Sequence, residues 1–291
     1  MMKLGAAWYG FREQTPANYF EMAAALGLKY VEIPLYEQVI KYEHFRYSRK
    51  GVEVMRALAE RAGVRMVSSV SALDIAGGFD MRGDDIDRGA VEFAMAAARR
   101  AIDIGADLGL DVLRITEPNV NLDHLDDARP YMEAYGRAMR VLGDHAVERG
   151  VRIVAENYGL TSKQVNWLLD AADHPAVGTL YDPCNYHRIG EDPLSALESL
   201  GQRVTYCHLK DAFRDDPRDP NLLFEGSRWP PSVAVGEGEI DWGPILAKLA
   251  TFYKGYLCIE YEIAEDVMRG TRASIEHIVS VAAERGIDIE L

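Results

Sequence analysis

The sequence predicts an α/β protein built as a single (β/α)8 barrel, with eight parallel strands inside a ring of helices. Short segments rich in β-branched and aromatic residues alternate with longer amphipathic segments along the 291 residues. Eight such pairs can be traced, and eight is the number of strand–helix units at which a parallel sheet closes into a barrel. A glycine often separates a helical segment from the next strand, as expected for a helix C-cap.

The predicted strands are short apolar runs bounded by Gly, polar residues or helix ends. In chain order they are Lys3–Trp8, Lys29–Ile33, Val64–Ser71, Val112–Thr116, Val151–Glu156, Val177–Asp182, Val204–Lys210 and Gly255–Glu260.

The predicted helices fill the intervals between these strands. They are Ala17–Leu26, Lys50–Ala62, Arg88–Leu108, Ala128–Arg149, Thr161–Ala172, Pro193–Leu200, Trp242–Phe252 and Asp266–Arg285. An open doubly wound sheet is the alternative fold, but no Gly-rich phosphate loop follows the first strand. Because no Pro/Ser-rich linker interrupts the pattern, we expect one domain over residues 1–291.

One connection is much longer than the others. Residues 212–240 contain four prolines and several aromatic and charged residues. Loops of this length are usually functional or disordered. Since the segment follows the seventh strand, we expect it to lie over the catalytic face as a partial lid, with an oligomer contact as the alternative.

Composition limits the classes of partner. Thirty-two basic residues stand against 46 acidic ones, a formal net charge of −14, which disfavours nucleic acid because phosphate binding needs clustered Lys and Arg. No apolar run is long enough for a membrane span, and the amino terminus does not resemble a signal peptide. We therefore expect a cytosolic homo-oligomer that acts on a small molecule, with its three cysteines as buried reduced thiols.

Four polar residues close four successive predicted strands. They are Glu156, Asp182, His208 and Glu260, and the intervals between them are 26, 26 and 52 residues. Side chains at the ends of parallel strands meet at one end of a barrel. Three carboxylates and one imidazole would repel one another there without a cation, and this donor set suits one divalent metal ion such as Mn, Mg, Co or Zn.

The segments around these residues resemble the xylose-isomerase-like TIM barrel superfamily, in its sugar phosphate isomerase/epimerase group. Similar proteins include ketose 3-epimerases, hydroxypyruvate isomerases and inosose dehydratases. The motifs that carry the resemblance are Ala155-Glu-Asn157, Asp182-Pro-Cys-Asn185, His208-Leu-Lys-Asp211, Gly236-Glu-Gly-Glu-Ile-Asp241 and Ile259-Glu260. The resemblance implies that the Glu, Asp, His and Glu of these motifs bind one metal ion and that Glu156 and Glu260 are also the catalytic acid and base.

The resemblance also suggests substrate-binding residues. Arg214 stands six residues after His208, where ketose epimerases have a substrate-binding Arg. Asn185 stands three residues after Asp182, where epimerases have a His, and His187 follows two residues later. The Asn departs from the epimerase pattern, because an amide cannot act as an acid or a base.

Other candidates come from position alone. Lys210, two residues after His208, should face the same end of the barrel, either to contact the substrate or to form a strand-end salt bridge. Glu237 lies in a glycine-rich turn and can contact substrate or stabilise the loop. Trp8, with Tyr9, can form a stacking wall for a sugar ring. Four further strand-end residues could face the same end: Glu32, Ser69, Ser71 and Glu117.

The function implied by the resemblance is a divalent-metal-dependent isomerase or epimerase for a sugar or keto-polyol. The metal would stabilise an enediolate while one of the two glutamates removes a proton and the other returns it. The alternative is a metal-dependent lyase, an inosose-dehydratase-like or glycoside-cleaving enzyme, that uses the same enediolate. Two weaker alternatives are an endonuclease-four-like DNA repair enzyme, opposed by the charge and the missing His ligands, and a sugar-binding protein without turnover.

Overall fold

The computed structural model describes residues 1–35, 49–70, 88–116, 128–215 and 230–291. The middle of the long predicted loop, residues 216–229, therefore lies outside the described residues, as do Ser71 and Glu117. The loop's two ends, 212–215 and 230–240, are described.

The eight predicted strands are present and form a closed parallel barrel. Strand β1 pairs with β8 on one side and with β2 on the other, which closes the ring. The strands are β1 (Met2–Ala6), β2 (Tyr30–Pro34), β3 (Arg65–Val70), β4 (Val112–Thr116), β5 (Arg152–Glu156), β6 (Val177–Tyr181), β7 (Val204–Leu209) and β8 (Tyr256–Ile259). A short strand not predicted from the sequence, β9 (Ile289–Glu290), pairs with Met2 and Lys3 at the amino-terminal end of β1.

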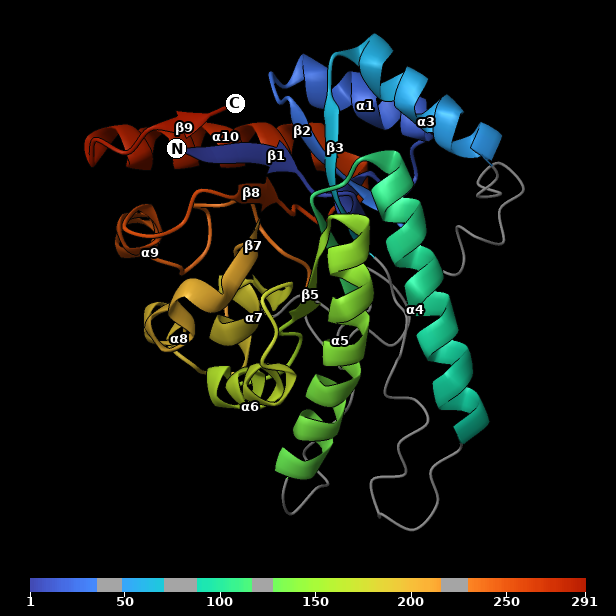
Figure 1. Cartoon of the computed structure of the whole chain (residues 1–291). Helices are drawn as coiled ribbons and strands as arrows, with labels where there is room; N and C mark the ends of the chain where they lie inside the picture. Colours follow the sequence, from blue (N-terminus) through green and yellow to red (C-terminus); the bar gives the residue numbers. More distant parts are fainter. Residues whose placement is uncertain (36–48, 71–87, 117–127, 216–229) are drawn as a thin grey trace.

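The eight predicted helices are also present, and Figure 1 shows them around the strands. They are α1 (Pro16–Ala25), α3 (Arg49–Ala62), α4 (Arg88–Leu108), α5 (Arg129–Arg149), α6 (Ser162–Ala172), α8 (Pro193–Leu200), α9 (Trp242–Ala250) and α10 (Val267–Glu284). Their ends and those of the strands differ from the sequence prediction by no more than two residues, as expected because helix ends fray.

Among the described residues, the sequence prediction missed one helix. The six-residue helix α7 (Pro183–Arg188) follows β6 directly, before α8. Its signal is the Asp182-Pro183 pair, since Asp is a preferred N-cap residue and Pro is favoured at the first helical position. Three short 3₁₀ turns complete the described elements: η1 (Tyr9–Phe11), η4 (Gly201–Arg203) and η6 (Ala264–Asp266).

Local sequence explains where the longer helices begin and end. Helix α6 begins at a capping box, in which the Gln164 backbone N–H donates to Thr161 Oγ1 and the Thr161 N–H donates to Gln164 Oε1. Helix α5 ends at Gly150, whose φ of 72° is the left-handed conformation that glycine adopts without steric cost.

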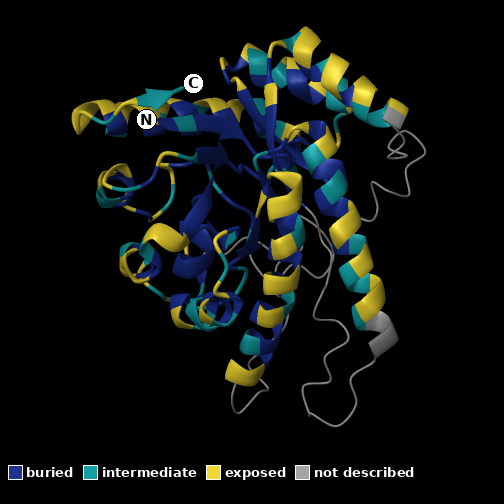
Figure 2. Cartoon of the chain, in the orientation of Figure 1, coloured by how far each residue is buried: buried dark blue, intermediate teal, exposed yellow. Residues whose placement is uncertain are grey.

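Strand alternation divides the core into two layers. On β7, Tyr206 points into the barrel, whereas Cys207 and Leu209 point outward against the helices. The same alternation places Val154, Leu180 and other apolar side chains inside the barrel. Figure 2 shows the strands buried, with the exposed faces of the helices turned outward. The next inward position on most strands, nearer the carboxyl end, is polar.

The three cysteines are buried and unpaired, as predicted. Burial raises the pKa of the Cys184 thiol to about 12, so the thiol stays protonated at neutral pH. No described helix combines the length and the apolar character needed to cross a membrane. The cytosolic location and the homo-oligomer stay predictions.

Candidate metal centre

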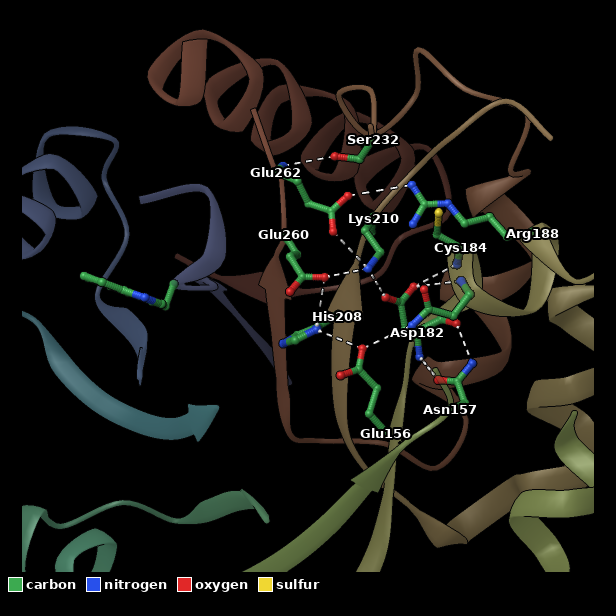
Figure 3. A network of polar contacts seen from close by, with 12 residues as sticks. Glu156, Asn157, Asp182, Cys184, Arg188, His208, Lys210, Ser232, Glu260 and Glu262 are labelled. Atoms are coloured by element: carbon green, nitrogen blue, oxygen red, sulfur yellow. Dashed lines mark hydrogen bonds and ion pairs between the residues drawn. The ribbon is translucent and has the colours of Figure 1, made fainter. Parts of the chain in front are cut away.

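The four strand-end residues meet at the carboxyl end of the barrel. Each of Glu156, Asp182, His208 and Glu260 offers one donor atom, and these atoms lie within 4.8 Å of one another. All four residues are buried. Figure 3 shows their side chains converging from neighbouring strands. Donor atoms around a single ion stand about 3–4.5 Å apart, so the spacing fits one divalent cation.

Strand geometry explains the convergence. Glu156 ends β5, two residues after the inward Val154, and His208 lies two residues after the inward Tyr206 on β7. Glu260 directly follows β8, two residues after the inward Cys258. The period of two along a strand therefore sends all three side chains into the same space.

Asp182 is held by two features of its own segment. Its Oδ1 caps helix α7 by accepting the backbone N–H groups of Cys184 at 2.9 Å and Asn185 at 3.2 Å. Its backbone forms a pair of hydrogen bonds with the Asn157 side chain, at 2.9 and 3.0 Å. The remaining oxygen, Oδ2, faces the centre, where it lies 2.9 Å from Lys210 Nζ.

The His208 ring is oriented by a glutamate from the opposite half of the chain. Nε2 lies 2.9 Å from Glu32 Oε2, and both side chains are fully buried. A carboxylate only accepts, so Nε2 carries the hydrogen and a neutral ring presents a lone pair at Nδ1. Nδ1 has no hydrogen-bond partner among the described residues and lies 3.5 Å from Glu260 Oε2 and 3.8 Å from Glu156 Oε1. A neutral ring would direct this lone pair at two carboxylates, so the space at Nδ1 favours either a proton or a metal cation.

The ionisation of the centre follows from burial and close charges. Burial by itself lowers the pKa of His208, but Glu260 and Glu32 outweigh it and raise that pKa well above its usual value. Burial raises the pKa of Glu260, but Lys210 and His208 outweigh it and hold the pKa well below its usual range. The centre therefore strongly favours positive charge beside ionised carboxylates.

Lys210 points into the centre, as predicted. Its Nζ lies 2.7 Å from Glu260 Oε2 and 3.6 Å from Glu262 Oε1, in addition to its contact with Asp182. Burial lowers the pKa of Lys210, but Asp182, Glu260 and Glu262 raise it well above its usual value. Lys210 is therefore an ammonium at neutral pH, and its salt bridge is made to the proposed ligands themselves.

Glu156 is held at both carboxylate oxygens. Arg114 from β4 pairs with Oε2, and Asn185 Nδ2 donates to Oε1 at 3.1 Å. Glu260 is held differently: Lys210 contacts Oε2, and within the described part of the chain Oε1 accepts no hydrogen bond. The two predicted catalytic glutamates are thus in unequal environments.

The connected cluster of buried charges is negative. Five carboxylates face three permanent cations; the members are Glu32, Glu156, Asp182, Glu260, Glu262, Lys210, Arg114 and Arg188. The net charge is −1 while His208 is protonated, as its raised pKa favours, and −2 when the ring is neutral and can bind a metal through Nδ1. Buried charge of this kind requires compensation. A divalent cation would balance it, so the residue types, the spacing and the charge all fit one.

Two predicted substrate residues, His187 and Arg214, contact each other's segments. His187, on α7, places Nε2 2.9 Å from Glu239 Oε2, and the Arg214 backbone N–H donates to the same oxygen at 2.9 Å. Arg214 Nε donates to the His187 carbonyl at 3.1 Å. These contacts join the two described ends of the long loop to α7, and substrate binding by either residue stays a prediction.

The side chains of Glu237 and Trp8 form no hydrogen bond or ion pair with the cluster among the described residues, and substrate contact by either stays a prediction. Glu237 is exposed and pairs with Arg269 at 3.1 Å. Trp8 is buried and packs edge-on against Tyr19, with ring centroids 5.2 Å apart. Burial and the charge of Glu262 raise the pKa of its neighbour Tyr9 to about 12.

Sequence reasoning missed three charged residues of the cluster. Arg114 lies two residues after the inward Val112 of β4, and Glu262 lies two residues after Glu260, so strand alternation could have found both. Arg188 comes from the missed helix α7; it donates to the Pro230 carbonyl at 2.7 Å and lies 3.7 Å from Glu262. Figure 3 shows this chain of contacts from Arg188 through Glu262 to Lys210.

The sequence is similar to one known protein family and to several known dehydratases. A model of the xylose isomerase-like TIM barrel family matches residues 20–281. The 3-dehydroshikimate dehydratase of Pseudomonas putida is 31% identical over 171 residues, which are 56% of this chain and 25% of that protein. The inosose dehydratase of Clostridium perfringens is 32% identical over 130 residues, 42% of this chain and 44% of that protein. The matches thus span from a quarter to less than half the length of these relatives.

Solved structures resemble the whole fold. A xylose isomerase-like TIM barrel/4-hydroxyphenylpyruvate dioxygenase fusion protein is 25% identical, with a TM-score of 0.71 over 99% of this chain and 45% of that one. An IOLI protein with a bound zinc atom is 16% identical, with a TM-score of 0.72 over 97% of this chain and 99% of that one. The D-psicose 3-epimerase of Clostridium cellulolyticum is 15% identical, with a TM-score of 0.71 over 96% and 99%.

Proposed function

This chain belongs to the xylose isomerase-like TIM barrel family, and on that premise we propose that it is a divalent-metal-dependent dehydratase for a hydroxylated ketone. Glu156, Asp182, His208 and Glu260 would hold the cation. The bound cation would supply Lewis-acid polarisation of the substrate carbonyl, which makes the neighbouring C–H acidic.

The relatives support loss of water over isomerisation. The two relatives described above, at 31% and 32% identity, are both named as dehydratases. Both names denote removal of water from the named substrate. The D-psicose 3-epimerase is similar at only 15% identity, a level that carries the fold and not the reaction.

The single observation that carries the proposal is the unequal environment of the two glutamates. Glu156 has both oxygens engaged, by Arg114 and Asn185, so it is a poor proton acceptor. Glu260 keeps Oε1 without a hydrogen bond from the described residues, so this oxygen is the one open to a substrate proton, even though Lys210 and His208 hold the Glu260 pKa low. A site with one effective base suits an elimination, whereas epimerisation needs proton transfer on two faces of the substrate.

Lys210 completes the elimination. Glu260 would take the proton from the carbon beside the carbonyl while the Lys210 ammonium gives a proton to the departing hydroxyl, which leaves as water. Because Lys210 Nζ lies 2.7 Å from Glu260 Oε2, the proton can return from Glu260 to Lys210. The balanced reaction converts the hydroxyketone into an unsaturated ketone and water, without an oxidant or reductant.

An isomerase or epimerase is the second candidate. The observation that favours it is the position of Glu156 and Glu260 on two sides of His208 Nδ1, at 3.8 and 3.5 Å. This arrangement can serve two proton transfers if Arg114 and Asn185 release Glu156. The expectation of an isomerase from the sequence is thus retained only as the weaker alternative.

Metal analysis followed by product analysis tests the proposal. The purified protein is stripped with a chelator, reloaded with Mn²⁺, Co²⁺, Mg²⁺ or Zn²⁺, and incubated in heavy water with an inosose, 3-dehydroshikimate and a set of ketoses. We expect a product lighter by one water with a new conjugated absorbance. A product of substrate composition that has acquired deuterium at carbon would instead identify an isomerase or epimerase, and full turnover by metal-free protein would contradict both.

A further inference from the structure

The hydrogen bond behind His208 comes from a strand far away in sequence. Glu32 lies on β2 and His208 on β7, 176 residues later, and the two side chains meet at 2.9 Å inside the barrel. Both are fully buried, so water cannot compete for the contact. Burial of a carboxyl group costs free energy unless hydrogen bonds or a nearby charge compensate it.

The backbone around Glu32 is shaped to aim this side chain. The register between β2 and β3 shifts at this point: Val31 pairs with Met66, but Glu32 pairs with Ser68. Such irregularities are frequent beside functional sites because they redirect a side chain. The second oxygen, Oε1, lies 3.4 Å from the Trp8 backbone N–H, so a second segment also contacts the carboxylate.

From this geometry we propose that Glu32 is a positioning residue, which sets the Nε2–H tautomer of His208 and directs the Nδ1 lone pair at the cation. The inference rests on the metal site of the proposed function. Glu32 is not itself one of the four proposed ligands, since its carboxylate contacts the ring nitrogen that points away from Glu156 and Glu260. Carboxylates that accept from the second nitrogen of a metal-bound His commonly raise metal affinity by about 10–100-fold.

Two substitutions of Glu32 distinguish a positioning role from a general structural role. Glu32→Gln keeps a carbonyl oxygen that accepts the Nε2–H, so it should retain the tautomer and most of the affinity. Glu32→Ala removes the acceptor and frees the ring to adopt the other tautomer. If Glu32 served packing alone, the decrease in cation affinity of each variant would follow the decrease in its free energy of unfolding.

The experiment uses the full chain stripped of metal and titrated with Co²⁺, followed by its visible absorbance. We expect Glu32→Ala to weaken Co²⁺ binding by about 10–100-fold and Glu32→Gln to weaken it by about threefold or less. The matched control is Asp103→Ala. It removes the carboxylate that lies 3.0 Å from His145 Nε2, between helices α4 and α5 and not among the residues of the metal centre. This control should bind Co²⁺ like the wild type.

Nitrogen NMR of ¹⁵N-His protein gives a readout that does not depend on activity. In the Zn²⁺-loaded wild type, His208, assigned from the loss of its signals in a His208→Gln variant, should carry its hydrogen at Nε2. An Nδ1–H tautomer in the wild type would overturn the proposal, even if Glu32→Ala does not fold. Equal affinities of Glu32→Ala and the wild type for Co²⁺ would also overturn it, whereas failure of the wild type to bind any cation would overturn the proposed function instead.

Discussion

Replacement of Lys210 by Met should separate catalysis from metal binding. The ammonium is buried and lies 2.7 Å from Glu260 and 2.9 Å from Asp182. Each contact is worth about 6 kcal/mol by Coulomb's law at an effective dielectric constant of about 20. Burial of the charges offsets much of this, so we expect the metal-free variant to lose about 3–5 kcal/mol, the usual effect of breaking a buried ion pair.

Loss of the ammonium should raise the affinity of the site for the cation and lower its catalytic rate. Removal of a positive charge next to two ligand oxygens should strengthen cation binding, so metal should restore more thermal stability to the variant than to the wild type. Loss of the proton donor should lower kcat by about 10²–10⁴-fold.

The assays are calorimetric melting with and without Mn²⁺ and steady-state kinetics on the best substrate. Lys248→Met is the matched control, because Lys248 forms an exposed pair with Glu198 at 3.3 Å, and such pairs contribute about 0–1 kcal/mol. A metal-loaded Lys210→Met variant with wild-type kcat would refute the assignment of Lys210 as the acid. Weaker metal binding in that variant would refute the electrostatic argument.

Further variants test the remaining parts of the argument. Glu260→Gln should abolish exchange of the substrate C–H with heavy water while the fold is retained, whereas Glu156→Gln should mainly weaken metal binding; similar exchange rates in both variants would contradict unequal roles. Arg214→Ala should raise KM with little change in metal content, and an unaltered KM would exclude substrate contact. Asp192→Ala should destabilise the protein by about 0.5–2 kcal/mol, because Asp192 caps α8 through the Ser195 N–H at 2.7 Å. Hydrogen bonds from Ser195 hold the pKa of Asp192 below its usual value. The stabilisation by this cap is therefore present above the unfolded-state pKa of about 3.9 and is lost as pH falls through the lower folded-state pKa. Equal decreases in the free energy of unfolding of Asp192→Ala at pH 7 and pH 2, measured by urea denaturation, would contradict this.

Local sequence determined the barrel and the identity of the converging side chains. Strands and helices follow from hydrophobic periodicity and caps, which depend on residues close in sequence. The meeting of Glu156, Asp182, His208 and Glu260 follows from parallel strands with a side-chain period of two, and the same rule predicted the direction of Lys210.

Only the tertiary structure decided which charged residue contacts which. Glu32 reaches His208 across the barrel, and Arg114 reaches Glu156, because closure of the ring and a register shift at Glu32 set the neighbours. The packing partner of the Trp8 ring, Tyr19, was likewise set by the tertiary structure, and the predicted role of Trp8 at the substrate wall stays a prediction. Periodicity states that a side chain points inward, but the partner it meets depends on strands that are 42 to 176 residues away, and no local pattern contains that information.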